Sequence, residues 1–182
     1  MKVLQVITNL ELGGAQKATL NLSKWLMERG HDVVVVSSSR GWLYRRVKEI
    51  FGRRFKEIRF LKREINPIYD LIAFFSLFIF ILENKFDLVH THTSKAGILG
   101  RWAAFFALKT RSIHTVHGFA FHDQEPLWRQ TLFRNLERLA SRWCDKTIFI
   151  SQPLIDWALR ERVVDEDKII KIYSGIEMDQ FH

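Results

Sequence analysis

"KVLQVITNLELGGAQKATLNLSKWLMERGHDVVVV", residues 2–36, contains one complete strand–helix–strand unit. Its first segment, Lys2 to Thr8, is short, apolar and rich in β-branched side chains, which predicts a buried strand. Apolar residues then recur at helical spacing from Ala15 to Arg29, and Gly30 predicts the end of that helix. The valine run at 33–36 is typical of a parallel strand that is covered on both faces.

The same alternation of strand and helix continues along the rest of the chain. Further helices are predicted at residues 42–51, 68–83, 94–109, 125–144 and 152–163, and further strands at 55–60, 86–93, 111–116, 145–151 and 167–173. No hairpin signal separates these segments, so neighbouring strands are expected to be parallel. The sequence therefore predicts the α/β class, with a single Rossmann-like, doubly wound parallel sheet of about seven strands.

The predicted helix at 68–83 is unusually apolar. Every residue from Leu71 to Leu82 except Ser76 is apolar. A bilayer span needs about 20 residues, so this segment is too short to cross one. Two alternatives remain, a helix buried in the core or a helix lying against a membrane surface. Burial against the sheet is the favoured interpretation for its phenylalanines, which are Phe74, Phe75, Phe78 and Phe80.

The size and composition of the chain indicate one ordered domain. Its 182 residues are 47% hydrophobic and include only 3 prolines. A single cysteine, Cys144, excludes a disulfide framework and fits a reducing compartment. The apolar run from Val3 to Ile7 is too short for the core of a signal peptide. We therefore expect a cytoplasmic protein.

The formal charge of +8 is concentrated in one segment. Ten basic residues lie between Arg40 and Arg63, and only Glu49 and Glu57 oppose them. A charge excess this concentrated suggests an anionic partner, such as a phosphate-bearing substrate, a membrane surface or nucleic acid. A solvated surface that keeps the protein soluble is the alternative. The candidate anion-binding or membrane patch consists of Arg45, Arg46, Lys48, Arg53 and Arg54.

Candidate binding residues follow several of the predicted strands. Ligands of doubly wound sheets bind beyond the carboxyl ends of the strands. Gly13 and Gly14 follow the first strand, where two explanations compete: a tight turn, or backbone amides left open to an anion. A polar stretch at 90–95 follows another strand, where Thr93 or Ser94 is placed to cap the next helix.

Five of the seven histidines fall between residues 90 and 122, which raises the possibility of a metal site. Alternation along a strand places His90 and His92 on the same face, and His114 lies within its own strand. No acidic or cysteine ligand accompanies them, so we expect no metal. The chain also lacks the G-x-S-x-G motif of a serine hydrolase.

Six stretches taken together resemble the N-terminal domain of the retaining glycosyltransferases of family 4, which have the two-domain GT-B fold. They are "LGGAQKATLNLSKWLMERGHDVVVVSS", "REINPIYDL", "FDLVHTHTSKAGILGR", "TVHGFAFH", "DKTIFIS" and "IIKIYSGIEMDQF". The resemblance runs over essentially the whole chain. It is closest to the branch that builds capsular, exopolysaccharide or lipopolysaccharide chains.

The resemblance implies roles for particular residues. Gly13 and Gly14 are expected near the donor phosphate or the acceptor, and His117 is expected to face the reacting sugar as the catalytic residue. The implied contacts to donor phosphate or acceptor are completed by Ser94, Lys95, Arg101 and Gly118. The family's closing Asn-Gly-Ile/Val-Asp pattern is replaced here by Ser174-Gly175-Ile176-Glu177.

The resemblance also implies what a complete enzyme needs. Residues 1–182 correspond to the acceptor-side domain, and the C-terminal domain that grips the nucleotide sugar is absent from this chain. The implied substrates are a nucleotide sugar, such as a UDP- or GDP-sugar, and a glycan or lipid-linked acceptor, with no cofactor. The basic patch then suggests peripheral attachment to the inner face of the cytoplasmic membrane. The chain alone is expected to bind nucleotide sugar poorly and to transfer nothing.

Other functions stay open at this stage. A nucleotide-sugar 2-epimerase would share the fold, and a non-catalytic subunit would supply the acceptor half to a separate donor-binding chain. A nucleic-acid-binding module is disfavoured, because the aromatic residues of the basic segment form no recognisable stacking motif. We therefore expect no nucleic acid partner.

Overall fold

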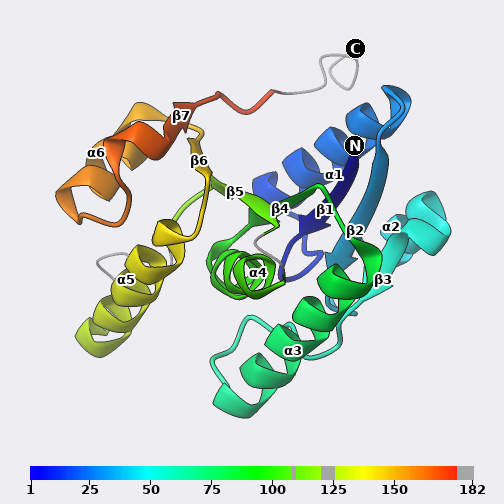
Figure 1. The fold of residues 1–182 in the computed structure, drawn as a ribbon, viewed down its shortest axis with the longest axis horizontal. Helices are drawn as coiled ribbons and strands as arrows, with labels where there is room; N and C mark the ends of the chain where they lie inside the picture. The colour runs from blue at the N-terminus through cyan, green and yellow to red at the C-terminus, as the bar shows by residue number, and fades with distance from the viewer. Residues whose placement is uncertain (108–109, 120–125, 176–182) are drawn as a thin grey trace.

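The computed structural model describes residues 1–107, 110–119 and 126–175 (Figure 1). These residues form a seven-stranded sheet in the order β3-β2-β1-β4-β5-β6-β7. Every pair of neighbouring strands is parallel. The predicted fold class is confirmed, including the number of strands.

The elements fall close to their predicted places. The strands are β1 (Lys2–Val6), β2 (Asp32–Ser37), β3 (Phe55–Glu57), β4 (Leu88–His92), β5 (Arg111–Val116), β6 (Lys146–Phe149) and β7 (Ile169–Lys171). The helices are α1 (Gly14–Glu28), α2 (Tyr44–Phe51), α3 (Pro67–Asn84), α4 (Ser94–Phe106), α5 (Leu127–Arg142) and α6 (Gln152–Arg160). Strand β3 is shorter than predicted, because the chain turns where the Leu61 amide bonds the Ile58 carbonyl.

Alternate residues of the central strand β1 face opposite layers of helices. Leu4 and Val6 pack with α3 and α4, whereas Ile7, just beyond the strand, packs with α1 and α2. A further cluster joins α4 to α5 and α6. The right-handed crossovers of a parallel sheet therefore place α1 and α2 on one face and α3, α4, α5 and α6 on the other (Figure 1).

The strand order reverses between β1 and β4. These two strands pair from Val3↔Leu88 to Val6↔Thr91, and the helices that follow them, α1 and α4, leave toward opposite faces of the sheet. Such a reversal opens a crevice beyond the carboxyl ends of the two strands. This crevice is where a ligand site is expected in a doubly wound sheet.

Helix α1 packs differently from its apolar pattern. Its buried residues are Gln16, Thr19 and Ser23, while Leu22 and Leu26 stay half-buried. The hydroxyls of Thr19 and Ser23 donate to carbonyls one turn earlier, so these polar groups are satisfied inside the protein. Short side chains let α1 lie close to the sheet, which leaves the larger apolar residues at its edge.

Helix α5 turns a charged residue toward the interior. The apolar pattern predicts an inward face made by Leu132, Leu136, Leu139 and Trp143. The buried residues are instead Phe133, Glu137, Ala140 and Ser141, and Leu132 is exposed. The reason is an ion pair with α4 that fixes the rotation of α5.

This ion pair joins Arg101 of α4 to Glu137 of α5. The guanidinium Nη2 lies 2.5 Å from the Glu137 Oε2, and Nε donates to the Gly97 carbonyl at 2.7 Å. Arg101 is 1% exposed, so each charge depends on the other for the interaction that water would otherwise supply. The pair is a structural link between two helices.

Replacing only one member of the Arg101–Glu137 pair is expected to destabilise the protein more than replacing both. Glu137→Leu leaves a buried, unpaired guanidinium and should lower the free energy of unfolding by about 3–5 kcal/mol. The double variant Arg101→Met/Glu137→Leu should recover most of that loss. Urea denaturation of the three proteins measures both values, and a double variant less stable than Glu137→Leu would contradict the pairing argument.

Helix α3 is only partly a core helix. Of its phenylalanines, Phe74, Phe78 and Phe80 pack against the core as predicted, whereas Phe75 is 49% exposed. At 18 residues α3 is two residues longer than predicted, and among the described residues it is the one helix long and apolar enough to cross a membrane by length and composition, which corrects the expectation that the segment is too short. Of this 18-residue window, 17% is buried.

Candidate functional site

The floor of the crevice is held by two threonines. The hydroxyls of Thr8, after β1, and Thr93, after β4, lie 2.7 Å apart, and the Thr93 hydroxyl donates to the His92 carbonyl. The Ala96 amide in the first turn of α4 donates to the Thr8 hydroxyl at 3.2 Å. The prediction that Thr93 or Ser94 caps α4 with its side chain is therefore wrong, because Thr8 supplies that oxygen from the neighbouring strand.

The glycine loop after β1 does not need glycine for a left-handed backbone conformation, although a Cβ at Gly13 would lie 2.6 Å from the Gln16 Oε1. Gly13 is extended (φ −160°) and precedes α1, and neither it nor Gly14 has a positive φ. A Cβ added to Gly14 would meet no atom within 4 Å. Of the two explanations offered by the sequence, the geometry favours open space for a ligand over a strained turn.

The first turn of α1 is suited to an anion. No side chain caps the helix among the described residues, and its first turn contains no acidic residue. Lys17 adds a positive charge beside the amides, which carry the partial positive charge of a helix N-terminus. Gln16 steadies the loop by donating to the Asn9 side chain at 3.1 Å.

A different glycine, Gly41, is the one that the loop geometry requires. It has φ +117°, and a Cβ there would lie 2.1 Å from the Leu10 carbonyl carbon. The contact is fixed by two backbone hydrogen bonds, from the Leu10 amide to the Arg40 carbonyl and from the Leu43 amide to the Leu10 carbonyl. Sequence reasoning missed Gly41, because its neighbour Leu10 is distant along the chain.

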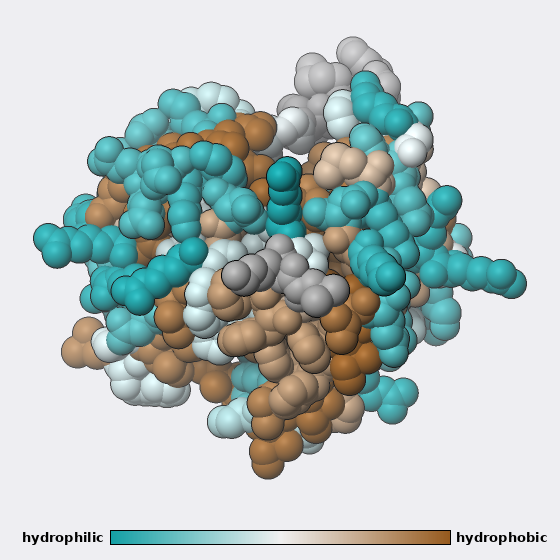
Figure 2. All heavy atoms as spheres, in the orientation of Figure 1, coloured by the Kyte–Doolittle hydropathy of each residue, from teal (hydrophilic) through white to brown (hydrophobic). Residues whose placement is uncertain are grey.

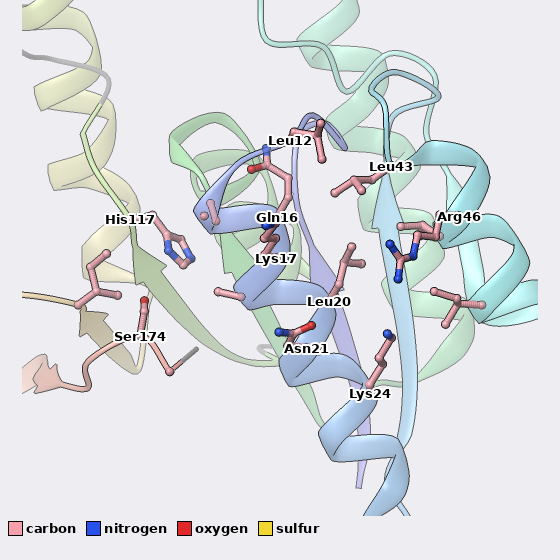
Figure 3. Close-up of a pocket in the computed structure, with 17 residues that line it drawn as sticks. Leu12, Gln16, Lys17, Leu20, Asn21, Lys24, Leu43, Arg46, His117 and Ser174 are labelled. Carbon is pink, nitrogen blue, oxygen red and sulfur yellow. The ribbon is translucent and has the colours of Figure 1, made fainter. Parts of the chain in front are cut away.

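The glycine loop and His117 line the same pocket (Figure 3). The pocket has a volume of about 800 Å³ and lies between α1, α2 and the end of β5. His117 extends from the end of β5 toward the first turn of α1, while Lys24 of α1 and Arg46 of α2 line the pocket on the other side of α1, where it faces α2. Lys17 and Lys24 were not predicted from the sequence, since only their position beside α2 reveals them.

A second hollow, of about 380 Å³, meets the first at His117. It lies over the face of β4, β5 and β6 that α1 leaves uncovered, and its lining includes Leu22, Leu26, Ile113 and Ile148. The rim residue His117 therefore stands between a basic pocket and an apolar one.

The orientation of His117 is set by a line of hydrogen bonds. The Gln5 Oε1 accepts from the His92 Nε2 at 2.8 Å, which leaves the His92 Nδ1 to accept from the His117 Nε2 at 3.3 Å. Burial lowers the pKa of His92 well below 6.5 and also lowers the pKa of His117. Both imidazoles are therefore neutral at pH 7, with the His117 Nδ1 left as an acceptor.

The remaining strand histidines are interior residues. His90 and His92 share a face as predicted, with ring centroids 4.2 Å apart. The His90 Nε2 lies 2.8 Å from the Thr115 hydroxyl, and His114 bonds the Thr91 hydroxyl at 2.9 Å. Within the described part of the chain, no group of three or more histidine, cysteine, aspartate or glutamate residues is arranged to hold a metal ion.

Acid is expected to destabilise the protein through His90. Burial lowers the pKa of His90 from 6.5 to about 3. Between pH 6.5 and pH 3, His90 is therefore protonated in the unfolded chain and neutral in the folded protein. Stability is full above pH 6.5 and falls as the pH drops, by about 2 kcal/mol between pH 7 and pH 5 from this group. Chemical denaturation of the wild type and His90→Gln at both pH values measures it, and an equal pH dependence would refute the assignment.

Three predicted acceptor contacts lie elsewhere in the fold. Arg101 is buried against Glu137, which corrects its expected role. Lys95 is 9% exposed, bonds the Glu64 carbonyl and pairs with the Asp70 carboxylate at 2.7 Å, so it joins α4 to α3. Ser94 is half-buried and lines neither hollow among the described residues.

Gly118 follows His117 at the rim and is exposed, with no atom within 4 Å of an added Cβ. The basic patch lies on α2 and the turn after it, and its five side chains are exposed. Arg46 is the patch residue that lines the pocket, whereas Arg54 lies 3.7 Å from the Asp32 carboxylate.

The fold and the pocket together define a class of protein: a doubly wound α/β domain with a pocket beyond the carboxyl ends of its strands. The sequence matches glycosyltransferase family 4 over residues 12–180, and the chain belongs to that family. It is 31% identical, over 93% of its length, to the Escherichia coli UDP-Gal:alpha-D-GlcNAc-diphosphoundecaprenol alpha-1,3-galactosyltransferase, and covers 43% of that protein.

Two solved structures show the same fold. A glycosyltransferase from Rickettsia africae ESF-5 superposes with a TM-score of 0.71 at 23% identity, over 99% of this chain and 44% of the other. The Neisseria meningitidis UDP-GlcNAc 2-epimerase bound to UDP-GlcNAc gives 0.66 at 17% identity, over 94% and 45%. The chain thus spans less than half the length of these three relatives. Epimerases share the GT-B fold, and the family match favours the transferase.

Two glycines are expected to respond oppositely to alanine. Gly14→Ala places a methyl group in open space in the first turn of a helix, so the free energy of unfolding should stay constant or rise by up to about 1 kcal/mol. Gly41→Ala combines a positive φ with a backbone clash and should lower it by at least about 2 kcal/mol. Thermal and urea unfolding test the pair, and a destabilised Gly14→Ala would restore the turn explanation.

Proposed function

We propose that this chain is the acceptor-side half of a retaining glycosyltransferase. The complete enzyme transfers a sugar from a nucleotide sugar, such as a UDP- or GDP-sugar, to a glycan or lipid-linked acceptor without a cofactor. A second α/β domain, or a separate subunit, supplies the nucleotide-binding wall. The observation that carries the proposal is one pocket lined by both the open Gly14 backbone and the neutral His117 imidazole.

Each wall of the pocket has a task in such a transfer. The amides at Gly13 and Gly14 stabilise an anionic phosphate through the N-terminus of α1. His117 donates its Nε2 proton to His92, so its Nδ1 accepts from a hydroxyl of the sugar. In a retaining transfer the leaving phosphate assists the acceptor hydroxyl, so the protein has to position the two substrates and stabilise the charge on the phosphate. The α1 amides and His117 supply these interactions.

The basic lining of the pocket is proposed to bind the acceptor. The name of the Escherichia coli relative specifies an acceptor that carries a diphosphate between its sugar and its lipid. Lys17 and Lys24 on α1 and Arg46 on α2 line the same pocket as the Gly14 backbone. Their charges suit a diphosphate, and the guanidinium of Arg46 can grip two phosphate oxygens at once.

A lipid-linked acceptor would also require the enzyme to work at a membrane surface. Its lipid stays in the membrane while its sugar enters the pocket, so the protein works as a peripheral enzyme at the cytoplasmic face. The exposed patch on α2 adds attraction to an anionic leaflet, about 1 kcal/mol for each lysine or arginine near the surface.

The proposal is tested by binding to the purified chain. A soluble analogue, GlcNAc-diphosphate on a short alkyl chain, is titrated into the protein and followed by calorimetry. Lys24→Ala and Arg46→Ala should each weaken binding by about 10- to 100-fold, as expected for a lost charge-assisted hydrogen bond. Arg53→Ala is the matched control, because Arg53 belongs to the same exposed patch and lies outside the pocket.

Two results would contradict this function. The first is binding of the analogue that Lys24→Ala and Arg46→Ala leave unchanged. The second is turnover of a UDP- or GDP-sugar by purified residues 1–182 alone, since the proposal places the donor wall outside these residues. Weak binding of both nucleotide sugars, together with tight binding of the analogue, is the expected pattern.

A further inference from the structure

The outward face of α3 is apolar along its whole length. Its exposed residues recur three or four positions apart, so they share one side of the helix. Their exposed fractions range from 38% to 70%. They are Ile68, Leu71, Ile72, Phe75, Ile79 and Leu82, and we call them the α3 ridge.

The fold does not require these apolar residues. The core is served by the opposite side of α3, where Ala73, Leu77 and Ile81 are fully buried. A surface helix of a soluble domain normally carries polar residues on its outward side. A contiguous exposed apolar surface is typical of a site that meets a partner protein or a membrane.

The ridge continues onto the neighbouring helix. Phe106, at the end of α4, is 55% exposed and packs edge-on against Phe74 of α3 with ring centroids 6.2 Å apart. Figure 2 shows apolar side chains gathered over α3 in the lower half of the view. The apolar surface therefore covers an area broader than a single helical stripe.

Positive charges border one side of the ridge. The Lys62 ammonium lies 4.3 Å from the centre of the Tyr69 ring, and the Lys56 ammonium lies 5.6 Å from that of Phe80. Both lysines belong to the strongly basic segment at 40–63, which ends directly before α3. Apolar side chains beside basic ones are the arrangement by which a helix binds an anionic bilayer surface.

We propose that the α3 ridge is a membrane-docking surface that lies in the interface of an anionic lipid bilayer. The helix cannot leave the domain to span the bilayer, because its inner side is part of the core and Asp70 in its first turn pairs with Lys95 of α4. It therefore lies along the membrane, with the ridge among the acyl chains and the lysines among the lipid phosphates.

The Asp70–Lys95 link gives this docking a consequence for the site. It ties the start of α3 to the start of α4, and α4 begins at the floor of the crevice where Thr8 holds the Ala96 amide. The docking surface and the crevice thus belong to one rigid unit. A lipid-linked molecule could therefore reach the crevice while its lipid stays in the bilayer on which the α3 ridge docks.

The test is flotation of the purified chain with vesicles of phosphatidylcholine alone or with added phosphatidylglycerol and cardiolipin. The chain should float with the anionic vesicles, and binding should weaken several-fold at high salt. The triple variant Ile72→Ser/Phe75→Ser/Ile79→Ser should bind at least about tenfold more weakly. The control Leu127→Ser/Trp128→Ser/Ile172→Ser removes three apolar residues that are at least as exposed but lie outside both the ridge and the basic segment, and it should bind like the wild type.

A second measurement reports insertion directly. The native Cys144 is 2% exposed, so a new cysteine at Phe75→Cys takes an environment-sensitive dye selectively. Its fluorescence should rise and shift to the blue on anionic vesicles, whereas the dye at Glu28→Cys on α1 should not respond. Circular dichroism confirms that each variant is folded.

Three outcomes would overturn the proposal: no flotation, equal flotation of the triple variant, or an unresponsive dye at position 75. A dimer that forms without vesicles and is lost in the triple variant would assign the ridge to a second copy of the chain instead. Flotation uses neither donor nor acceptor, so its failure leaves the transferase function standing.

Discussion

The organisation of this domain depends on how β1 and β4 are joined at their carboxyl ends. The two threonine hydroxyls at the crevice floor bind each other, and Thr8 also accepts from the Ala96 amide at the start of α4. This contact joins β1 to β4 at the point where the strand order reverses. It also caps α4, which has no capping hydrogen bond from a side chain of its own N-terminal residues. The carboxyl ends of β1 and β4 are therefore fixed to each other, and His92, the residue before Thr93, bonds both Gln5 and His117.

Charge is distributed over this frame in two distinct ways. Arg101 and Lys95 are buried and committed to Glu137 and Asp70, where they join helices within the layer on one face of the sheet. The basic residues at the pocket come from α1 and α2 on the other face. In this domain of net charge +8, some basic residues join helices through buried ion pairs and others line the pocket. The residue type alone does not distinguish these two groups.

Local patterns were enough to predict the sheet, because strand–helix alternation and the period of two act over a few residues. They place His90 and His92 on one face of a strand and Gly14 beyond the end of β1, and the structure has both features. They failed where a distant residue decides the outcome. The family resemblance implies an acceptor contact for Arg101, but its buried partner Glu137, 36 positions away, could not be recognised from the sequence. The polar buried side of α1 likewise reversed the apolar pattern.

The contact at Gly41 limits how the pocket adapts. The loop that precedes α1 and the loop that precedes α2 are joined backbone to backbone through Leu10, so the starts of the two helices are held in a fixed relation. The pocket would then adapt to ligands of different size through rotamer changes of long lining side chains such as Lys24 and Arg46, with no change in the backbone. A swap of substrate preference between relatives would accordingly need changes in side-chain length along these helices, and would leave the scaffold untouched.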